Sequence, residues 1–195
     1  MKKLTLLIII IMSALLLEAR VMGQFGIGLD LNGKQSFSNA LFSHDSDVKT
    51  GVSLYGEALM SQSIVLGDLL FGGGLEYQLP RELDKVNEDL RTRKISSLPM
   101  YLTGKFVLNS VILSPELIVR LGYDIPITQD NFNYTDVNGG LYWAMGAGIG
   151  FKPLVLQLMY KSSQNSFSWK DDIDLPNLKA TSTNSQLSIQ LGIRL

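Results

Sequence analysis

The chain has 195 residues, of which 46% are apolar and 18% are charged, with a net charge of −1 and no cysteine. The charged fraction lies below the roughly 25% of soluble domains. No internal apolar run reaches the ~18 residues of a spanning helix, which excludes a polytopic helical membrane protein. The absence of cysteine excludes disulfides and thiolate chemistry, the apolar content excludes disorder, and the charge balance argues against nucleic-acid binding. An apolar chain without long apolar runs implies alternation, which is typical of strands.

Residues 1–23 have the three parts of a secretory signal peptide. Two lysines precede an apolar core at residues 4–17, and Val21 and Gly23 occupy the −3 and −1 positions of a cleavage site. Cleavage there makes Gln24 the first mature residue. The alternative is an uncleaved anchor helix, for which the apolar core is short. No cysteine follows the core, so a lipoprotein anchor is excluded.

The mature chain, residues 24–195, is dominated by period-two alternation of apolar and polar residues. Eight segments show it, each of roughly the length that a tilted transmembrane strand needs: 25–31, 52–60, 71–78, 97–106, 116–124, 141–151, 154–161 and 186–195. No helical periodicity of similar strength competes with it. The pattern predicts an all-β domain of eight antiparallel strands.

The predicted connections alternate between long and short. The long ones are polar and comprise residues 32–50, 80–94, 125–139 and 162–183, and the short ones comprise 61–66, 109–114 and 152–153. Short periplasmic turns and long extracellular loops are typical of outer-membrane β-barrels. We therefore expect an eight-stranded transmembrane barrel in the outer membrane of a Gram-negative bacterium, with both ends of the mature chain on the periplasmic side.

A soluble barrel of the lipocalin type is the alternative, because alternation alone does not say which face is outside. Small residues form the polar face of the sixth segment, which suits a crowded barrel interior better than a water-facing surface. The aromatic residues of the apolar face also sort by strand end into two girdles. The periplasmic girdle comprises Phe25, Phe71, Phe106 and Phe151, and the extracellular girdle comprises Tyr77, Tyr123, Trp143 and Tyr160. This sorting favours the membrane barrel, with outer-membrane lipid and lipopolysaccharide around it and the barrel-insertion machinery as a partner.

Nine charged residues share the strand face that is predicted to line the lumen: Asp30, Glu57, Glu76, Lys105, Glu116, Arg120, Asp124, Lys161 and Arg194. Charges inside a small barrel are expected to pair, because an unpaired buried charge is costly. The expected result is a network of salt bridges that plugs the lumen. The alternative is a narrow path for ions or small solutes, since eight strands leave no room for a wide channel.

The sequence gives little support for catalysis. The single histidine, His44, lies between Ser43 and Asp45 in a predicted loop, where adjacent side chains point apart and do not form a triad. A lipid-modifying outer-membrane enzyme remains the third hypothesis. Asp171, Asp172 and Asp174 lack the fixed spacing of a calcium loop, so a solvated charge run is expected there. We expect no enzymatic activity, no cofactor and no metal.

The chain resembles the small outer-membrane β-barrels of Bacteroidetes that are described as PorT-like or porin-family. The resemblance rests on the order of several short motifs at residues 26–31, 98–102, 120–123 and 146–151, and on a closing hairpin formed by residues 154–160 and 186–195. It implies an outer-membrane barrel and no settled activity. The leading hypothesis is a non-enzymatic barrel that presents its extracellular loops to a surface or secretion partner.

Overall fold

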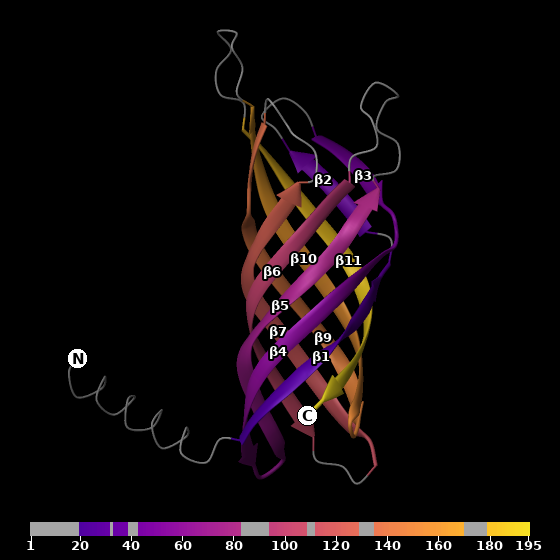
Figure 1. Ribbon diagram of the computed structural model, residues 1–195, viewed down its shortest axis with the longest axis vertical. Helices are drawn as coiled ribbons and strands as arrows, with labels where there is room; N and C mark the ends of the chain where they lie inside the picture. The colour runs from indigo at the N-terminus through magenta and orange to yellow at the C-terminus, as the bar shows by residue number, and fades with distance from the viewer. Residues whose placement is uncertain are drawn as a thin grey trace, which may run out of the picture.

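The computed structural model describes residues 20–31, 33–38, 43–82, 94–108, 112–128, 135–169 and 179–195 (Figure 1). All regular structure in these ranges is β-strand. Within them, no helix has the length and apolar character needed to cross a membrane. Of the predicted signal peptide only the last four residues are described, and the predicted cleavage after Gly23 stays a prediction.

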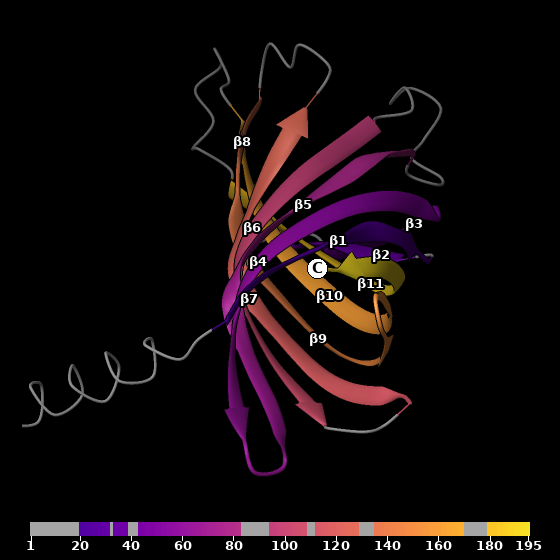
Figure 2. The same ribbon diagram turned by 60° about the horizontal axis from the view of Figure 1, so that its bottom comes forward.

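Eight of the described strands close into one antiparallel ring. In ring order they are β1 (Arg20–Asp30), β4 (Gly51–Ile64), β5 (Gly67–Glu82), β6 (Lys94–Leu108), β7 (Ser114–Thr128), β9 (Gly140–Phe151), β10 (Leu154–Trp169) and β11 (Lys179–Arg194). Pairing of β1 with β11 closes the ring, so that β10 and β11 lie across the lumen from β5 and β6 (Figure 2). The predicted all-β, eight-stranded antiparallel barrel is confirmed.

The strands extend further than the sequence pattern predicted, and all four expected long loops contain strand residues. Within 32–50 lie β2 (Gly33–Ser38) and β3 (Ser43–Val48), and within 125–139 lies β8 (Thr135–Asn138). The hairpin of β2 and β3 continues that of β1 and β4 in one register. His44 therefore lies in a strand rather than in a loop. The prediction failed because both faces of a strand are wet above the membrane, so the apolar alternation that marks a buried face disappears.

The short connections lie at the opposite end of the barrel. β4 and β5 are joined through residues 65–66, and β9 and β10 through residues 152–153. The C-terminus lies at this same end (Figure 1). Backbone hydrogen bonds in both directions join Leu195 to Gly23, which brings residue 195 to β1 beside the predicted start of the mature sequence.

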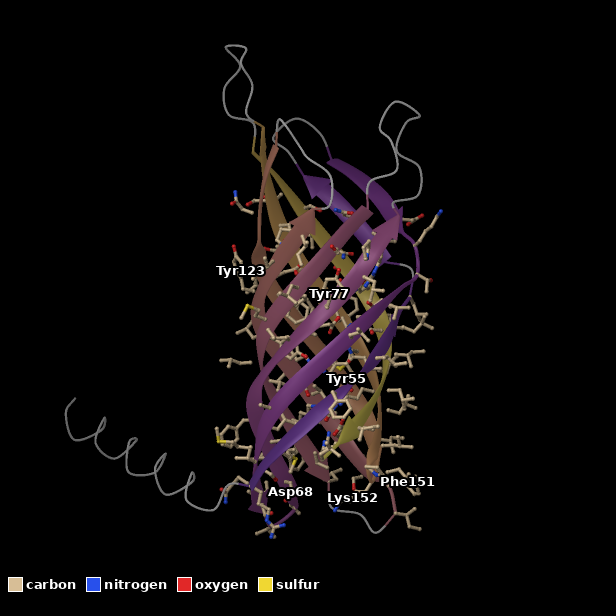
Figure 3. The ribbon with its side chains drawn as sticks, viewed as in Figure 1. Tyr55, Asp68, Tyr77, Tyr123, Phe151 and Lys152 are labelled. Atoms are coloured by element: carbon tan, nitrogen blue, oxygen red, sulfur yellow. The ribbon has the colours of Figure 1, made fainter. Side chains whose placement is uncertain are left out.

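The outward face of the ring is apolar and carries the predicted aromatic residues. Phe25, Phe71, Phe151, Tyr123 and Tyr160 are exposed, and Phe106, Tyr77 and Trp143 are half-buried. Figure 3 shows Phe151 near the turns and Tyr77 and Tyr123 toward the other end of the barrel. The rings of Trp143 and Tyr160 contact each other across β9 and β10, with centroids 5.6 Å apart. This is the band and girdle arrangement of a lipid-facing barrel surface.

Substitution of Leu158 by arginine is expected to lower the free energy of unfolding by about 2–4 kcal/mol, because Leu158 pairs with Ala147, midway between the girdle residues Phe151 and Trp143, and is 51% exposed on the lipid-facing side. Unfolding by urea in lipid vesicles measures the change. The matched control is Val65→Arg, since Val65 is fully exposed in the turn between β4 and β5. Equal costs at the two positions would argue against a membrane-embedded band.

Candidate functional site: the charged barrel lumen

The inward face of the ring gathers the charged residues into one lumen. All nine residues that the sequence analysis assigned to this face point inward: eight are buried, and the side chain of Arg194 retains 16% exposure near the periplasmic end. The structure adds a tenth, Arg81. With Arg81 included, the described lumen holds five acidic and five basic side chains. The charges are therefore balanced in number, which lowers the cost of burying them.

The lower part of the network is centred on the side chain of Gln24 in β1. Its Oε1 accepts hydrogen bonds from Lys105 Nζ at 2.9 Å and from Arg194 at 2.8 and 2.9 Å. Its Nε2 donates to the hydroxyl of Tyr55 at 3.1 Å. Arg194 also forms a 2.5 Å ion pair with Glu116. A neutral amide thus holds two cations together, so that β1 is linked across the lumen to β6 and, at the seam, to β11.

Arg120 occupies the centre of the lumen with no solvent exposure of its side chain. Its Nη2 lies 2.8 Å from Glu57, and its Nη1 lies 3.6 Å from Glu76. The guanidinium lies over two aromatic rings, 4.8 Å from the centroid of Tyr101 and 5.3 Å from that of Tyr55. A planar guanidinium that stacks on aromatic rings while its nitrogens lie beside carboxylates is a geometry that arginine supplies and lysine does not.

The upper part of the network is centred on Lys161 in β10. Its Nζ lies 2.6 Å from Glu76 and 2.9 Å from Asp30. Arg81 pairs with the other oxygen of Asp30 and also donates to Gln186. Asp30 in β1 thus contacts strands two places away on either side, β10 through Lys161 and β5 through Arg81. The pair of Lys161 with Glu76 joins β10 to β5 directly across the lumen.

Arg81 was missed by the sequence analysis because the ladder is irregular beside it. The pairing of β5 with β6 shifts by one residue between Gln78 and Arg81. Glu76 and Gln78 point inward on one parity, and the shift lets Arg81 point inward on the other. A β-bulge changes side-chain parity in this way, and the only local signal is Pro80, which cannot donate to a ladder. Pro99 in β6, by contrast, keeps its register opposite Asp124 in β7.

Apolar side chains close the lumen below and beside the charges. Leu59, Leu70 and Val107 form a buried cluster near the turns, and Met22 packs against it. A second buried cluster lies at the centre of the lumen. It consists of Tyr101, Ile118, Tyr142, Ala144 and Met159. These clusters leave the inward face packed rather than open, as expected for the interior of an eight-stranded barrel.

The described residues do not bring together the candidates for metal binding or catalysis. No group of three His, Cys, Asp or Glu side chains suited to a metal ion occurs among them. The backbone of His44 and Asp45 is described in β3, but their side chains are not. Asp171, Asp172 and Asp174 lie outside the described residues. The lumen therefore remains the best-defined site of the described structure.

Comparison with solved structures identifies the architecture. The outer membrane protein OprG from Pseudomonas aeruginosa has a TM-score of 0.57 at 11% identity, over 90% of this chain and 95% of that one. The outer membrane protein AlkL, solved in lipid bilayers, has a TM-score of 0.55 at 10% identity, over 90% and 89%. No family model matches the chain, and no curated protein sequence matches it. The likeness is one of fold: the chain forms the same kind of small β-barrel as these outer-membrane proteins, with an apolar outer band suited to a membrane.

Proposed function

We propose that the protein is a non-enzymatic outer-membrane barrel whose lumen is closed by its own side chains and whose extracellular strand extensions present loops to a surface or secretion partner. The observation that carries the proposal is the filling of the lumen. Four of its five carboxylates are paired with cations, and apolar clusters lie beside and below them. A lumen filled by side chains in this way favours a structural barrel that carries loops over a channel that conducts solutes.

The strand extensions support the second half of the proposal. β2, β3 and β8, together with the upper parts of β10 and β11, continue the ladders beyond the level of the extracellular girdle. Loops that are carried on paired strands are held in fixed positions, which favours recognition of a partner. We infer, on the motifs described above, that the protein is related to the PorT-like barrels of Bacteroidetes. Lipopolysaccharide and the barrel-insertion machinery are the further partners that we expect.

Planar-bilayer recording tests the closed lumen. The purified mature chain is expected to show no steady conductance in potassium chloride, because the buried charges are paired with one another and leave no open path for ions. A steady conductance that changes in the Glu57→Gln variant would overturn this part of the proposal and favour the narrow channel. Glu57 is the informative position because it pairs with both Lys105 and Arg120.

Photo-crosslinking in cells tests the role of the extracellular end. A photoreactive residue at Thr181, which is exposed in the upper part of β11, is expected to give an adduct of discrete mass. The same residue at Val65, in the turn at the opposite end, is the control and is expected to give a different pattern. No adduct from Thr181 or from Lys34, which is exposed on neighbouring β2, would overturn the proposed role of this surface.

A further inference from the structure

The lipid-facing wall of the barrel contains an apolar groove that is separate from the charged lumen. Its volume is about 910 Å³, and residues of β5, β6, β7, β9, β10 and β11 line it. The groove follows two neighbouring rows of paired, outward residues. One row contains Gly104 and Met145, and the other contains Phe106 and Ala147. Two residues along each strand separate the rows, which is a spacing of roughly 6–7 Å.

Two small residues, one in each row, deepen the groove. A Cβ atom added at Gly104 would meet only the side chain of Val119, at an ordinary contact distance of 3.5 Å, so the packing of the barrel does not require glycine there. Ala147 is exposed and is paired on its two sides with Leu117 and Leu158. A glycine inside a strand often marks a place where another molecule approaches closely. The wall is therefore recessed at these two positions.

The groove runs obliquely from one aromatic girdle to the other. Its lower end lies at Phe71, which pairs with Gly104 and belongs to the periplasmic girdle, and its upper end lies at Tyr160 of the extracellular girdle. From β5 to β11 it crosses five strand spacings, or roughly 24 Å. One leaflet of a bilayer has a hydrocarbon depth of only about 15 Å. The groove is therefore long enough for a whole acyl chain that lies along it.

The upper end of the groove leads to a polar and aromatic rim. Ser162 and Ser185 continue the outward parity of Tyr160 and Leu187 toward the extracellular side, and their hydroxyl oxygens lie 3.3 Å apart. Trp143 pairs with Ser162, and its ring contacts that of Tyr160. Serine hydroxyls and the indole N–H are hydrogen-bond donors, and tryptophan and tyrosine favour the level of lipid headgroups. This end thus suits the headgroup of a lipid in the outer leaflet.

We propose that the groove binds one acyl chain of a lipopolysaccharide molecule, with the headgroup against Ser162, Ser185 and Trp143. The wall faces hydrocarbon, where polar occupants are unfavourable. Association inside a membrane is driven largely by van der Waals packing, and a chain in a recess makes more of these contacts than one on a convex wall. The rim at the extracellular end favours a lipid of the outer leaflet over a phospholipid of the periplasmic leaflet. The site is independent of any partner that the extracellular loops recognise.

Native mass spectrometry of the barrel in detergent tests the site, with purified lipid A as the probe. We expect the wild type to retain one lipid A molecule, and Gly104→Phe and Ala147→Phe, which fill the groove, to lose most of it. Ser185→Ala removes one hydroxyl of the rim and is expected to retain less than the wild type. The matched control is Gly56→Phe, because Gly56 also points outward into open space but does not line the groove. We expect this control to retain lipid A as the wild type does.

Each contrary outcome has a separate meaning. Undiminished retention by both filled variants would show that lipid A is held elsewhere, and an absence of retention by the wild type would show that the groove is no site; either result overturns the proposal. Equal retention of phosphatidylethanolamine, lost in the same variants, would overturn the assignment to lipopolysaccharide. A dimer that is present in the wild type and absent in Ala147→Phe would assign the groove to a second copy of the chain instead. Heat-modifiable gel migration verifies that each variant is folded.

Discussion

Substitution of Arg120 by methionine is expected to lower the free energy of unfolding by about 3–5 kcal/mol, which is the usual cost of removing one member of a buried ion pair. The variant keeps most of the volume and loses the charge. Glu57 and Glu76 then each lose one of their two cations, and the stacking on Tyr55 and Tyr101 is lost as well. Equilibrium unfolding in vesicles, followed by tryptophan fluorescence and gel migration, measures the change.

Two further variants show whether the loss comes from the geometry of Arg120. Arg120→Lys preserves the charge but lacks the planar guanidinium that lies over the rings of Tyr55 and Tyr101, and we expect it to recover only part of the stability. Lys152→Met removes a cation that is exposed in the turn between β9 and β10, and its effect is expected to stay within about 0.5 kcal/mol. An Arg120→Met barrel as stable as the wild type would mean that the network does not stabilise the fold.

Substitution of Gly26 by valine is expected to lower the free energy of unfolding by about 3 kcal/mol, toward the upper end of the cost of overpacking. Gly26 faces Gly192 across the seam of β1 and β11, and it also faces Tyr55 in β4. A Cβ atom at Gly26 would lie 2.8 Å from Cε1 of Tyr55 and would overlap the carbonyl oxygen of Leu191. The ring of Tyr55 must then move away from its place above Arg120, so the substitution affects both the seam and the network.

Gly56→Val provides a matched control in the adjacent strand. Gly56 pairs with Phe25, the neighbour of Gly26, but it points outward, and a Cβ atom added there would meet no heavy atom within 4 Å. We expect its free energy of unfolding to change by no more than about 0.5 kcal/mol. Similar losses in the two variants would show that the cost arises from valine in the strand rather than from the displacement of Tyr55.

Alternation in the sequence was sufficient to predict the barrel because the membrane acts on one face of every strand. Ile27 and Leu29 face lipid, whereas Asp30, on the opposite parity of the same strand, faces the lumen. Every spanning strand must satisfy the same requirement, since lipid offers no partner for polar groups. The number of strands, their antiparallel order and the division into a lipid face and a lumen face follow directly from this repeated pattern.

The extracellular half could not be predicted in the same way. Gly33–Ser38 and Ser43–Val48 are largely polar, and their pairing is favoured by the ladder that β1 and β4 already form rather than by burial of an apolar face. Similarly, Pro80 is the only signal in residues 79–82 of an irregular ladder, and it does not by itself predict that the register shifts and that Arg81 turns inward. Both features depend on pairing with a neighbouring strand, and this pairing cannot be inferred from the residues of one segment alone.

The sequence by itself determined which residues of the regularly paired strands face the lumen, and so nine of its ten described charges; the tenth, Arg81, follows a register shift that the sequence did not predict. Only the tertiary structure decided how they pair, because the partners come from strands that are far apart in the chain. Lys161 meets Asp30 and Glu76, Arg120 lies between two tyrosines, and Asp124 has no described cation paired with it. These contacts are set by the closure and tilt of the ring, which fix the height of each side chain in the lumen. The alternation therefore specified the barrel. Its closure determined which charges pair in the lumen and that Asp124 has no ion-pair partner among the described residues.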